Sequence, residues 1–138
     1  MKISVISSGR YSGEYHTHKM YDAKTVKNWK LMIREADNAV GAYYVMDPMS
    51  VPISWYKGVA LFSMGNIDKA KTSFEDAYKI HPYNIHVLNN LGSCYESMGD
   101  HKKAETYYLK ALTISSDFEE ARLNLSAVYF NMKDYEKI

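Results

Sequence analysis

The chain repeats itself at a fixed spacing between Val51 and Phe118. The residues that recur are small or apolar: Gly58, Gly65, Ala70, Ala77 and Ile80 return as Gly92, Gly99, Ala104, Ala111 and Ile114. We call this spacing, which takes Gly58 to Gly92, the repeat period. A fixed period of about 34 residues is typical of a helical repeat array, in which each pair of helices packs mainly against its neighbours. The period therefore predicts an all-α fold built from antiparallel helix pairs.

The glycines and caps predict where the helices begin and end. Gly65 and Gly99 suit the left-handed conformation that ends a helix. Asn84 and Asp100 can cap the helices that follow them. Asp117, with Glu120 three residues later, resembles a capping box at the start of a further helix. The interpretation is a tail over 1–13, a degenerate repeat over 14–50, repeats over 51–84 and 85–118, and a partial repeat over 119–138.

Outside the two clear repeats, the same reasoning applies to weaker patterns. Apolar residues at helical spacing on one face, the last of them Tyr43, predict a helix from about residue 28 to residue 46, stopped by Asp47-Pro48. The next helix is expected from about residue 52 to 64, with Ser50 as its cap, and its partner from about 67 to 81. Ile80 in that partner helix, and Ile114 one repeat later, are expected in the buried stripe. Within each hairpin, Gly58 is predicted to face Ala70 and Gly92 to face Ala104, so that the two helices approach closely.

The repeat pattern resembles the tetratricopeptide repeat, a helix-turn-helix unit of about 34 residues. The residues that carry the resemblance are Leu88, Leu91, Gly92, Tyr95, Gly99, Ala104, Tyr108 and Ala111, with Pro82 where that motif ends in proline. The resemblance implies a right-handed superhelix whose first helices line a concave groove. It also implies a protein-interaction scaffold that takes a peptide or protein segment in that groove.

Helical phase selects the side chains that would face this groove from the first helices of the repeats. The candidate peptide-binding residues are Trp55, Phe62, Asn89, Asn90, Glu96, Asn124 and Phe130. Asn90 and Asn124 lie one repeat period apart and resemble the stacked asparagines that grip a peptide backbone in O-linked N-acetylglucosamine transferases. The alternative interpretation is that these two amides tie neighbouring helices together. A clamp for the acidic tails of chaperones fits poorly, because Glu120 would repel a carboxylate.

Other functional classes lack support in the sequence. A net charge of +1 gives no electrostatic basis for binding nucleic acid. His16 and His18 are interpreted as a solvated pair rather than metal ligands, and Cys94 as a small core residue. We therefore predict no metal, no cofactor and no catalysis. No stretch is apolar enough to insert in a membrane, which predicts a soluble segment whose compartment, cytoplasmic or periplasmic, is open.

Two further hypotheses concern the context of the chain. The array ends at Ile138 a few residues into a new helix, and the run from Asn124 to Tyr129 resembles repeats appended to bacterial cell-envelope glycan ligases. The chain would then be a regulatory or tethering module of a larger membrane or cell-envelope enzyme of the O-antigen ligase kind. The other hypothesis is a homo-oligomer formed through an uncapped C-terminal end between Leu125 and Met132.

Overall fold

The computed structural model describes residues 2–41, 44–134 and 137–138, with side chains from residue 9 onward. These residues form helices and no strand, which confirms the predicted all-α class. The helices are α1 (Lys2–Thr25), α2 (Trp29–Ala39), α3 (Ile53–Ser63), α4 (Ile67–Ile80), α5 (Ile85–Ser97), α6 (His101–Ile114) and α7 (Glu119–Asn131). None of the helices in this described part is long and apolar enough to cross a bilayer.

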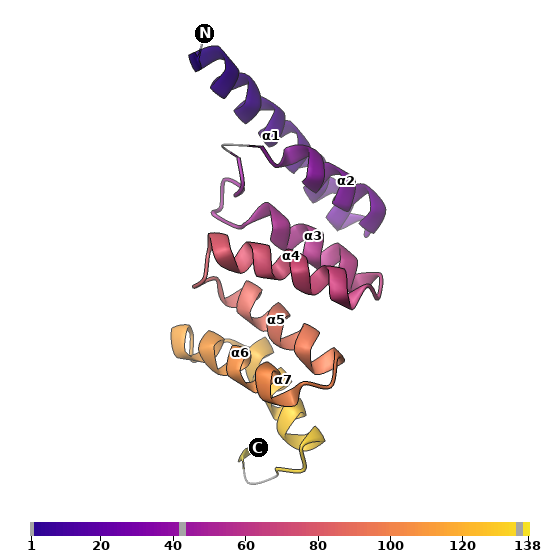
Figure 1. Cartoon of the computed structure of the whole chain (residues 1–138), viewed down its shortest axis with the longest axis vertical. Coiled ribbons are helices and arrows are strands. Elements are labelled where there is room, and N and C mark those ends of the chain that lie inside the picture. Colours follow the sequence, from indigo (N-terminus) through magenta and orange to yellow (C-terminus); the bar gives the residue numbers. More distant parts are fainter. Residues whose placement is uncertain (1, 42–43, 135–136) are drawn as a thin grey trace. The chain divides into compact units, whose positions relative to one another are not determined.

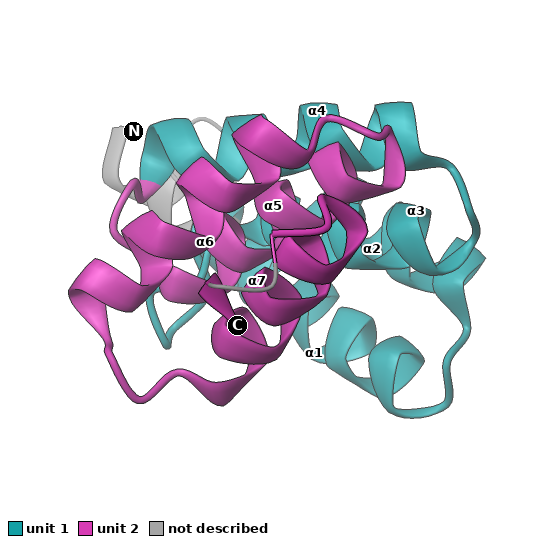
Figure 2. Cartoon of the chain, turned by 90° about the horizontal axis from the view of Figure 1, so that it is seen from below, with its two compact units in different colours: residues 1–80 teal, residues 81–138 magenta. Residues whose placement is uncertain are grey.

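Two compact units divide the chain at residue 80 (Figure 2). Unit 1, residues 1–80, holds the hairpins α1–α2 and α3–α4, and α2 also packs on α3. Unit 2, residues 81–138, holds the hairpin α5–α6, and α7 packs on α6 and more lightly on α5. In Figure 1 each hairpin is a pair of antiparallel helices joined by a short turn.

The turns that end the first helices share one backbone conformation. Gly65 and Gly99 have φ values of 78° and 80°, which confirms the predicted left-handed ends of α3 and α5. Lys27, after α1, has φ 54°, and Lys133, after α7, has φ 58°. Left-handed backbone costs a residue with a side chain roughly 1–2 kcal/mol, so glycine suits this turn but is not indispensable.

The turn at Lys27 also fixes how the first hairpin aligns with the second. Lys27 and Gly65 take the same place in their hairpins, and their separation in sequence is slightly longer than the repeat period. We call the separation from Lys27 to Gly65 the first-hairpin offset. It identifies the residue of α3 or α4 that corresponds to any residue of α1 or α2.

Side-chain caps begin several of the helices that the sequence located. Asn84 Oδ1 accepts hydrogen bonds from the amides of His86 and Val87, and Asp100 Oδ1 accepts one from the amide of Lys103. Asn28 caps α2 by the same means, through the amide of Leu31. The caps predicted at Asn84 and Asp100 are therefore confirmed.

The glycines in the middle of α3 and α5 allow an aromatic ring to lie against the helix backbone. A Cβ atom on Gly58 would lie 2.5 Å from Cε1 of Phe74, and one on Gly92 would lie 2.5 Å from Cε1 of Tyr108. Close packing at these glycines was predicted, but the nearest atoms belong to the two rings and not to Ala70 or Ala104. Both rings are buried.

Changing Gly92 to alanine should therefore lower the free energy of unfolding. The added methyl group would overlap the ring of Tyr108, and overpacking of this kind costs about 1–3 kcal/mol. Gly9 is the matched control, because it also lies within a helix but has nothing within 4 Å of a built Cβ. Gly9→Ala should instead stabilise by up to about 1 kcal/mol. Urea denaturation of both variants tests the contrast, and two changes of the same sign would contradict it.

The N-terminal residues differ from the prediction of a tail over 1–13, because α1 begins at Lys2. No proline precedes Pro48, so no residue in this stretch lacks a backbone N–H donor. Glycine in a helix costs about 1 kcal/mol without breaking it. Gly13 also has a packing role, since a Cβ atom there would lie 2.5 Å from Cγ of Tyr44.

The prediction that a helix continues to residue 46 was also wrong. α2 ends at Ala39, and its cap Val40 is in an extended conformation directly before Gly41. Single antiparallel bridges then join Gly41 to Tyr44 and Met46 to Pro52. Tyr43, which was placed on the same helix face, lies outside the described residues.

Three smaller predictions need correction. Pro52 and not Ser50 precedes the first residue of α3. Phe118 precedes α7 without a side-chain cap, because the carboxylate of Asp117 accepts a hydrogen bond from the Ser115 hydroxyl at 2.7 Å instead of from a helix amide. Ile80 and Ile114, expected in the buried stripe, are 36% and 47% exposed, because each is the last residue of its helix.

Candidate functional site

A buried carboxylate organises the loop between α2 and α3. Asp47 is 5% exposed and accepts four hydrogen bonds. Its Oδ2 atom accepts from the hydroxyls of Tyr21, at 2.7 Å, and Tyr56, at 2.6 Å. Its Oδ1 atom accepts from the backbone amides of Met49 and Val51, both at 2.8 Å. One side chain therefore joins α1, α3 and the loop that precedes α3.

An open hollow lies at the surface beside the two tyrosines that bind Asp47. Its volume is about 360 Å³ and it is lined by Tyr21, Lys24, Thr25, Met49 and Tyr56. The ammonium of Lys24 lies 5.1 Å from the ring centre of Trp55 and 5.3 Å from that of Tyr56. Such a contact of a cation with aromatic faces contributes about 0.5–1 kcal/mol at an exposed site. We call Tyr21, Lys24, Trp55 and Tyr56 the aromatic surface of unit 1.

Burial and hydrogen bonding also control the ionisation of these tyrosines. Burial first, and then the hydrogen bond to Asp47, raises the pKa of both Tyr21 and Tyr56 well above the ordinary value of 10. In unit 2, burial raises the pKa of Tyr108 to about 12. Each phenol thus stays protonated in the folded chain at a pH where the unfolded chain has begun to lose its proton.

The fold should therefore lose stability steeply above pH 10. A raised pKa contributes stability that is complete below the unfolded value of 10 and is lost as the pH rises toward the folded value. For Tyr56 and Tyr108, which are 4% and 1% exposed, the loss at pH 11 should be about 3 kcal/mol together. Urea denaturation at pH 8 and pH 11 measures it.

The variant Tyr108→Phe should remove its share of this loss, whereas Tyr11→Phe, at a residue that is 75% exposed, should leave it unchanged. An equal loss of stability at pH 11 in the parent chain and in Tyr108→Phe would contradict the assignment to Tyr108.

In unit 2 the helices α5 and α7 are joined by amide hydrogen bonds. Asn124 Nδ2 donates to Oδ1 of Asn89 at 3.0 Å, and Asn89 is buried. Further along the same two helices, Asn131 Nδ2 donates to Oε1 of Glu96 at 2.7 Å. The other oxygen of Glu96 lies 2.8 Å from Nδ1 of His101. The amide of Asn124 therefore ties α7 to α5 through Asn89, as the alternative interpretation held for it.

The predicted binding residues thus fall in two groups, one in each unit. In unit 1, Trp55 and Phe62 are half-buried, and Trp55 packs against the core with its ring centre 4.9 Å from that of Tyr56. In unit 2, Asn90 and Asn124 are half-buried and Phe130 is 62% exposed. Asn89 and Glu96 already serve as acceptors for α7. As a ligand site, these residues remain a prediction.

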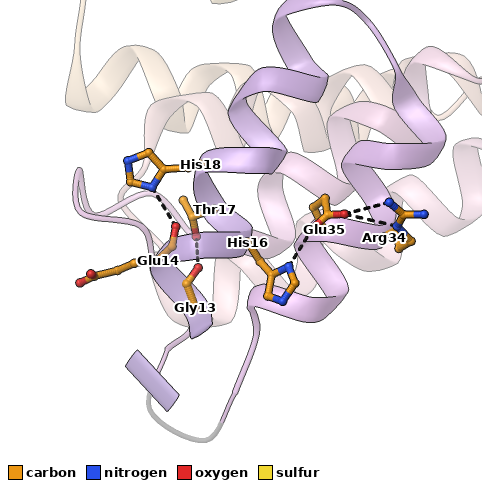
Figure 3. Close-up of polar contacts among 7 residues, drawn as sticks. All are labelled: Gly13, Glu14, His16, Thr17, His18, Arg34 and Glu35. Atoms are coloured by element: carbon orange, nitrogen blue, oxygen red, sulfur yellow. Dashed lines mark hydrogen bonds and ion pairs between the residues drawn. The ribbon is translucent and has the colours of Figure 1, made fainter. Parts of the chain in front are cut away.

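A polar cluster between α1 and α2 accounts for the two histidines near the N-terminus (Figure 3). His16 Nδ1 lies 2.7 Å from Oε2 of the buried Glu35, and Arg34 donates to the other carboxylate oxygen at 3.1 Å. The hydrogen bond from His16 holds the pKa of Glu35 below its ordinary value. His18 instead donates to the backbone oxygen of Glu14 at 2.8 Å. The interpretation of a solvated pair is therefore wrong for His16, which links two helices.

Sequence reasoning missed several residues of the aromatic surface of unit 1. Tyr21 and Lys24 lie in α1, which the repeat period does not reach. They align with Val59 and Phe62 of α3 only through the first-hairpin offset, which depends on the left-handed turn at Lys27 that the structure shows. Cys94, by contrast, is fully buried, as predicted for a small core residue.

The chain resembles known proteins in sequence and in fold. A family model for the tetratricopeptide repeat matches residues 51–117. The tetratricopeptide domain of Arabidopsis OM64 superposes with a TM-score of 0.81 at 15% identity, over 89% of this chain and 98% of that one. The first such domain of Spaghetti (RPAP3), solved with the HSP90 peptide SRMEEVD, gives 0.80 at 13% identity, over 90% and 95%. No curated protein matches the chain.

A third structure with the same fold belongs to a much longer enzyme. The O-GlcNAc transferase of Thermobaculum terrenum, solved as a mutant, superposes with a TM-score of 0.76 at 16% identity. The match covers 88% of this chain and 22% of that enzyme. At such identities the three structures establish the fold, and the family match establishes the repeats. Residues 51–117 are tetratricopeptide repeats, and the chain has the tetratricopeptide-repeat fold.

Proposed function

We propose that this protein binds a peptide or protein segment on the first helices of its hairpins. These are α1 and α3 in unit 1, and α5 and α7 in unit 2. The observation that carries the proposal is the hollow of about 360 Å³ bounded by Tyr21, Lys24 and Tyr56. The half-buried rings of Tyr21 and Trp55 supply apolar contact area at low entropy cost, and Lys24 adds a donor for a carbonyl or carboxylate oxygen.

The hydrogen bonds of Asp47 favour a site that is ordered before the ligand arrives. The two hydroxyl bonds hold the rings of Tyr21 and Tyr56, and the two amide bonds hold the loop that carries Met49. A surface that is already ordered avoids the entropy cost of ordering on association. This rigidity suits a docking face for an extended segment.

In unit 2, Asn90 and Asn124 are the amides proposed to hold the peptide backbone. They occupy equivalent positions one repeat apart, and a side-chain amide can both donate to and accept from a peptide bond. The hydrogen bond to Asn89 uses one of the donor hydrogens of Asn124. The carboxylates of Glu96 and Glu120 disfavour an acidic tail here, although the Spaghetti domain was solved with a peptide that contains two glutamates. We therefore propose a neutral or mixed segment for this unit.

Selection from a random peptide library displayed on phage tests the proposal. The selected peptides should bind the parent chain, and Lys24→Ala, Trp55→Ala or Asn90→Ala should weaken their affinity by about tenfold, measured by calorimetry. Lys102→Ala is the control, since Lys102 is exposed on α6, a second helix of its hairpin. Affinities that are unchanged in all three variants would show that the first helices are not the binding site.

The context of the chain stays a prediction. The hypothesis of a module from a larger membrane or cell-envelope enzyme, and that of a homo-oligomer, both concern molecules beyond this chain. In α7 the side chains of Leu125, Val128 and Tyr129 are buried, whereas Leu123 and Phe130 are exposed. Any self-association through this helix would therefore use Leu123 and Phe130.

A further inference from the structure

A second cavity in unit 1 lies between α2, α3 and α4 and shares no residue with the aromatic surface. Its volume is about 330 Å³. Its walls are apolar where Val40, Ile53 and Ile80 line it, and polar where Ser54, Ser73, Asp37, Asp76 and Lys57 do. A cavity of this size with a few convergent polar groups has the general character of a ligand site.

The cavity exists because two serines stand where the neighbouring hairpins have larger side chains. By the first-hairpin offset, the positions of Ser54 and Ser73 correspond to His16 and Glu35 in the α1–α2 hairpin. These two larger side chains join α1 to α2, with 2.7 Å between Nδ1 of His16 and Oε2 of Glu35. One repeat period forward, the same positions hold Leu88, which is buried, and Tyr107. The α3–α4 hairpin alone among these three combines two small hydroxyl side chains at this pair of positions.

The hydroxyl of Ser54 lacks a partner. Its Oγ atom is inaccessible to solvent and has no hydrogen-bond partner within the described part of the chain. A buried hydroxyl that is left without a hydrogen bond carries a desolvation cost. Because the atom is inaccessible in this conformation, an incoming polar group would pair with it after the Ser54 side chain rotates toward the cavity.

The charges at the rim favour a cation. Two carboxylates, Asp37 and Asp76, line the cavity with one ammonium, Lys57. Lys57 Nζ lies 2.6 Å from Oδ1 of Asp37, so this pair is largely self-neutralised. Asp76 is paired at 3.3 Å with Lys79, whose side chain is 75% exposed and does not line the cavity. A surface pair of this kind is weak, so Asp76 can exchange Lys79 for a ligand.

We propose that this cavity binds the side chain of an arginine from a partner protein segment. The aliphatic stem of arginine matches the walls at Val40 and Ile80, and its guanidinium matches Asp76 and the Ser54 hydroxyl. Guanidinium is a planar group with five N–H donors and is less strongly hydrated than an ammonium. It is therefore suited to a half-enclosed site with one carboxylate and one orphan acceptor.

Nuclear magnetic resonance titration of the whole chain with N-acetylarginine amide tests this inference. The amide signals of Val40, Ser54, Ser73 and Ile80 should shift and saturate at millimolar concentrations, the affinity range expected for a single side chain. N-acetylcitrulline amide has nearly the same shape without the charge, and should bind at least about tenfold more weakly. Signals that do not move, or that move equally with both compounds, would overturn the proposal.

Variants separate this cavity from the proposed peptide face. The double variant Ser54→Leu with Ser73→Tyr places the residue types of the α5–α6 hairpin in the cavity. It should abolish the shifts of the amide signals while the circular dichroism spectrum stays that of the parent chain. Should that pair disturb folding, Ser73→Val alone should weaken binding at least threefold. Asp76→Asn should do the same, whereas Asp68→Asn and Lys24→Ala should leave binding unchanged. Arginine binding that survives both the filling variants and Asp76→Asn would place the contact elsewhere.

Discussion

Replacing Asp47 with alanine should lower the free energy of unfolding by about 3–5 kcal/mol. The change removes the acceptor of four hydrogen bonds at once and leaves the buried hydroxyl of Tyr56 and the part-buried hydroxyl of Tyr21 without it. Each buried donor that loses its acceptor typically costs about 1–3 kcal/mol, because it stays desolvated. Urea denaturation followed by circular dichroism measures the change.

Two variants bracket this expected result. Asp47→Asn keeps one oxygen for the amides of Met49 and Val51 and loses only the charge and one acceptor. It should therefore lower the free energy of unfolding by roughly half as much as Asp47→Ala does. Asp22→Ala removes an exposed aspartate of the same unit and should change stability by no more than about 0.5 kcal/mol. An Asp47→Ala variant as stable as Asp22→Ala would mean that the loop does not depend on this carboxylate.

Replacing Phe74 with alanine should be equally damaging, at about 3–5 kcal/mol. The ring is fully buried and lies directly against the backbone at Gly58. Its loss leaves a cavity that the rigid helix pair can only partly close, and phenylalanine-to-alanine changes in cores cost this much. Urea denaturation again gives the measurement.

The α1–α2 hairpin indicates how to rescue that variant. At the positions that match Gly58 and Phe74 by the first-hairpin offset, this hairpin has Met20 and Ala36, both at most 1% exposed. In the α1–α2 hairpin the large side chain is therefore on the first helix, whereas in the α3–α4 hairpin it is on the second. Gly58→Met alone should destabilise by overpacking, but combined with Phe74→Ala it should recover about 2 kcal/mol through direct coupling. Additive effects of the two changes would refute the exchange.

Much of the fold was predictable because the hairpin turns and caps are local. Gly65 and Gly99 in the left-handed conformation and Asn84 and Asp100 as caps each act within a few residues of themselves. The spacing of small residues then indicated which helices pair. The sequence-based prediction failed where a tertiary contact decides, as when Gly13 makes room for Tyr44 within a helix that had been interpreted as a tail.

The candidate site was less accessible to such reasoning. Trp55 was found because it lies on a repeat with a known phase, whereas Lys24 lies on a helix outside the repeat period. Asp47 was interpreted only as the residue before a proline. Its role depends on the hydroxyls of Tyr21, on α1, and Tyr56, on α3. Contacts between residues of such separate elements produce no periodic pattern in a single sequence.

The lysines at the outer turns have a consequence for how such arrays are detected. Lys27 and Lys133 take the same backbone conformation as Gly65 and Gly99, and the α1–α2 hairpin forms with a lysine where α3–α4 and α5–α6 have glycine. The region that the family model matches, 51–117, contains both glycine turns and neither lysine turn. Motif searches that weight glycine will therefore miss a hairpin such as α1–α2, whose turn has the same backbone geometry without glycine.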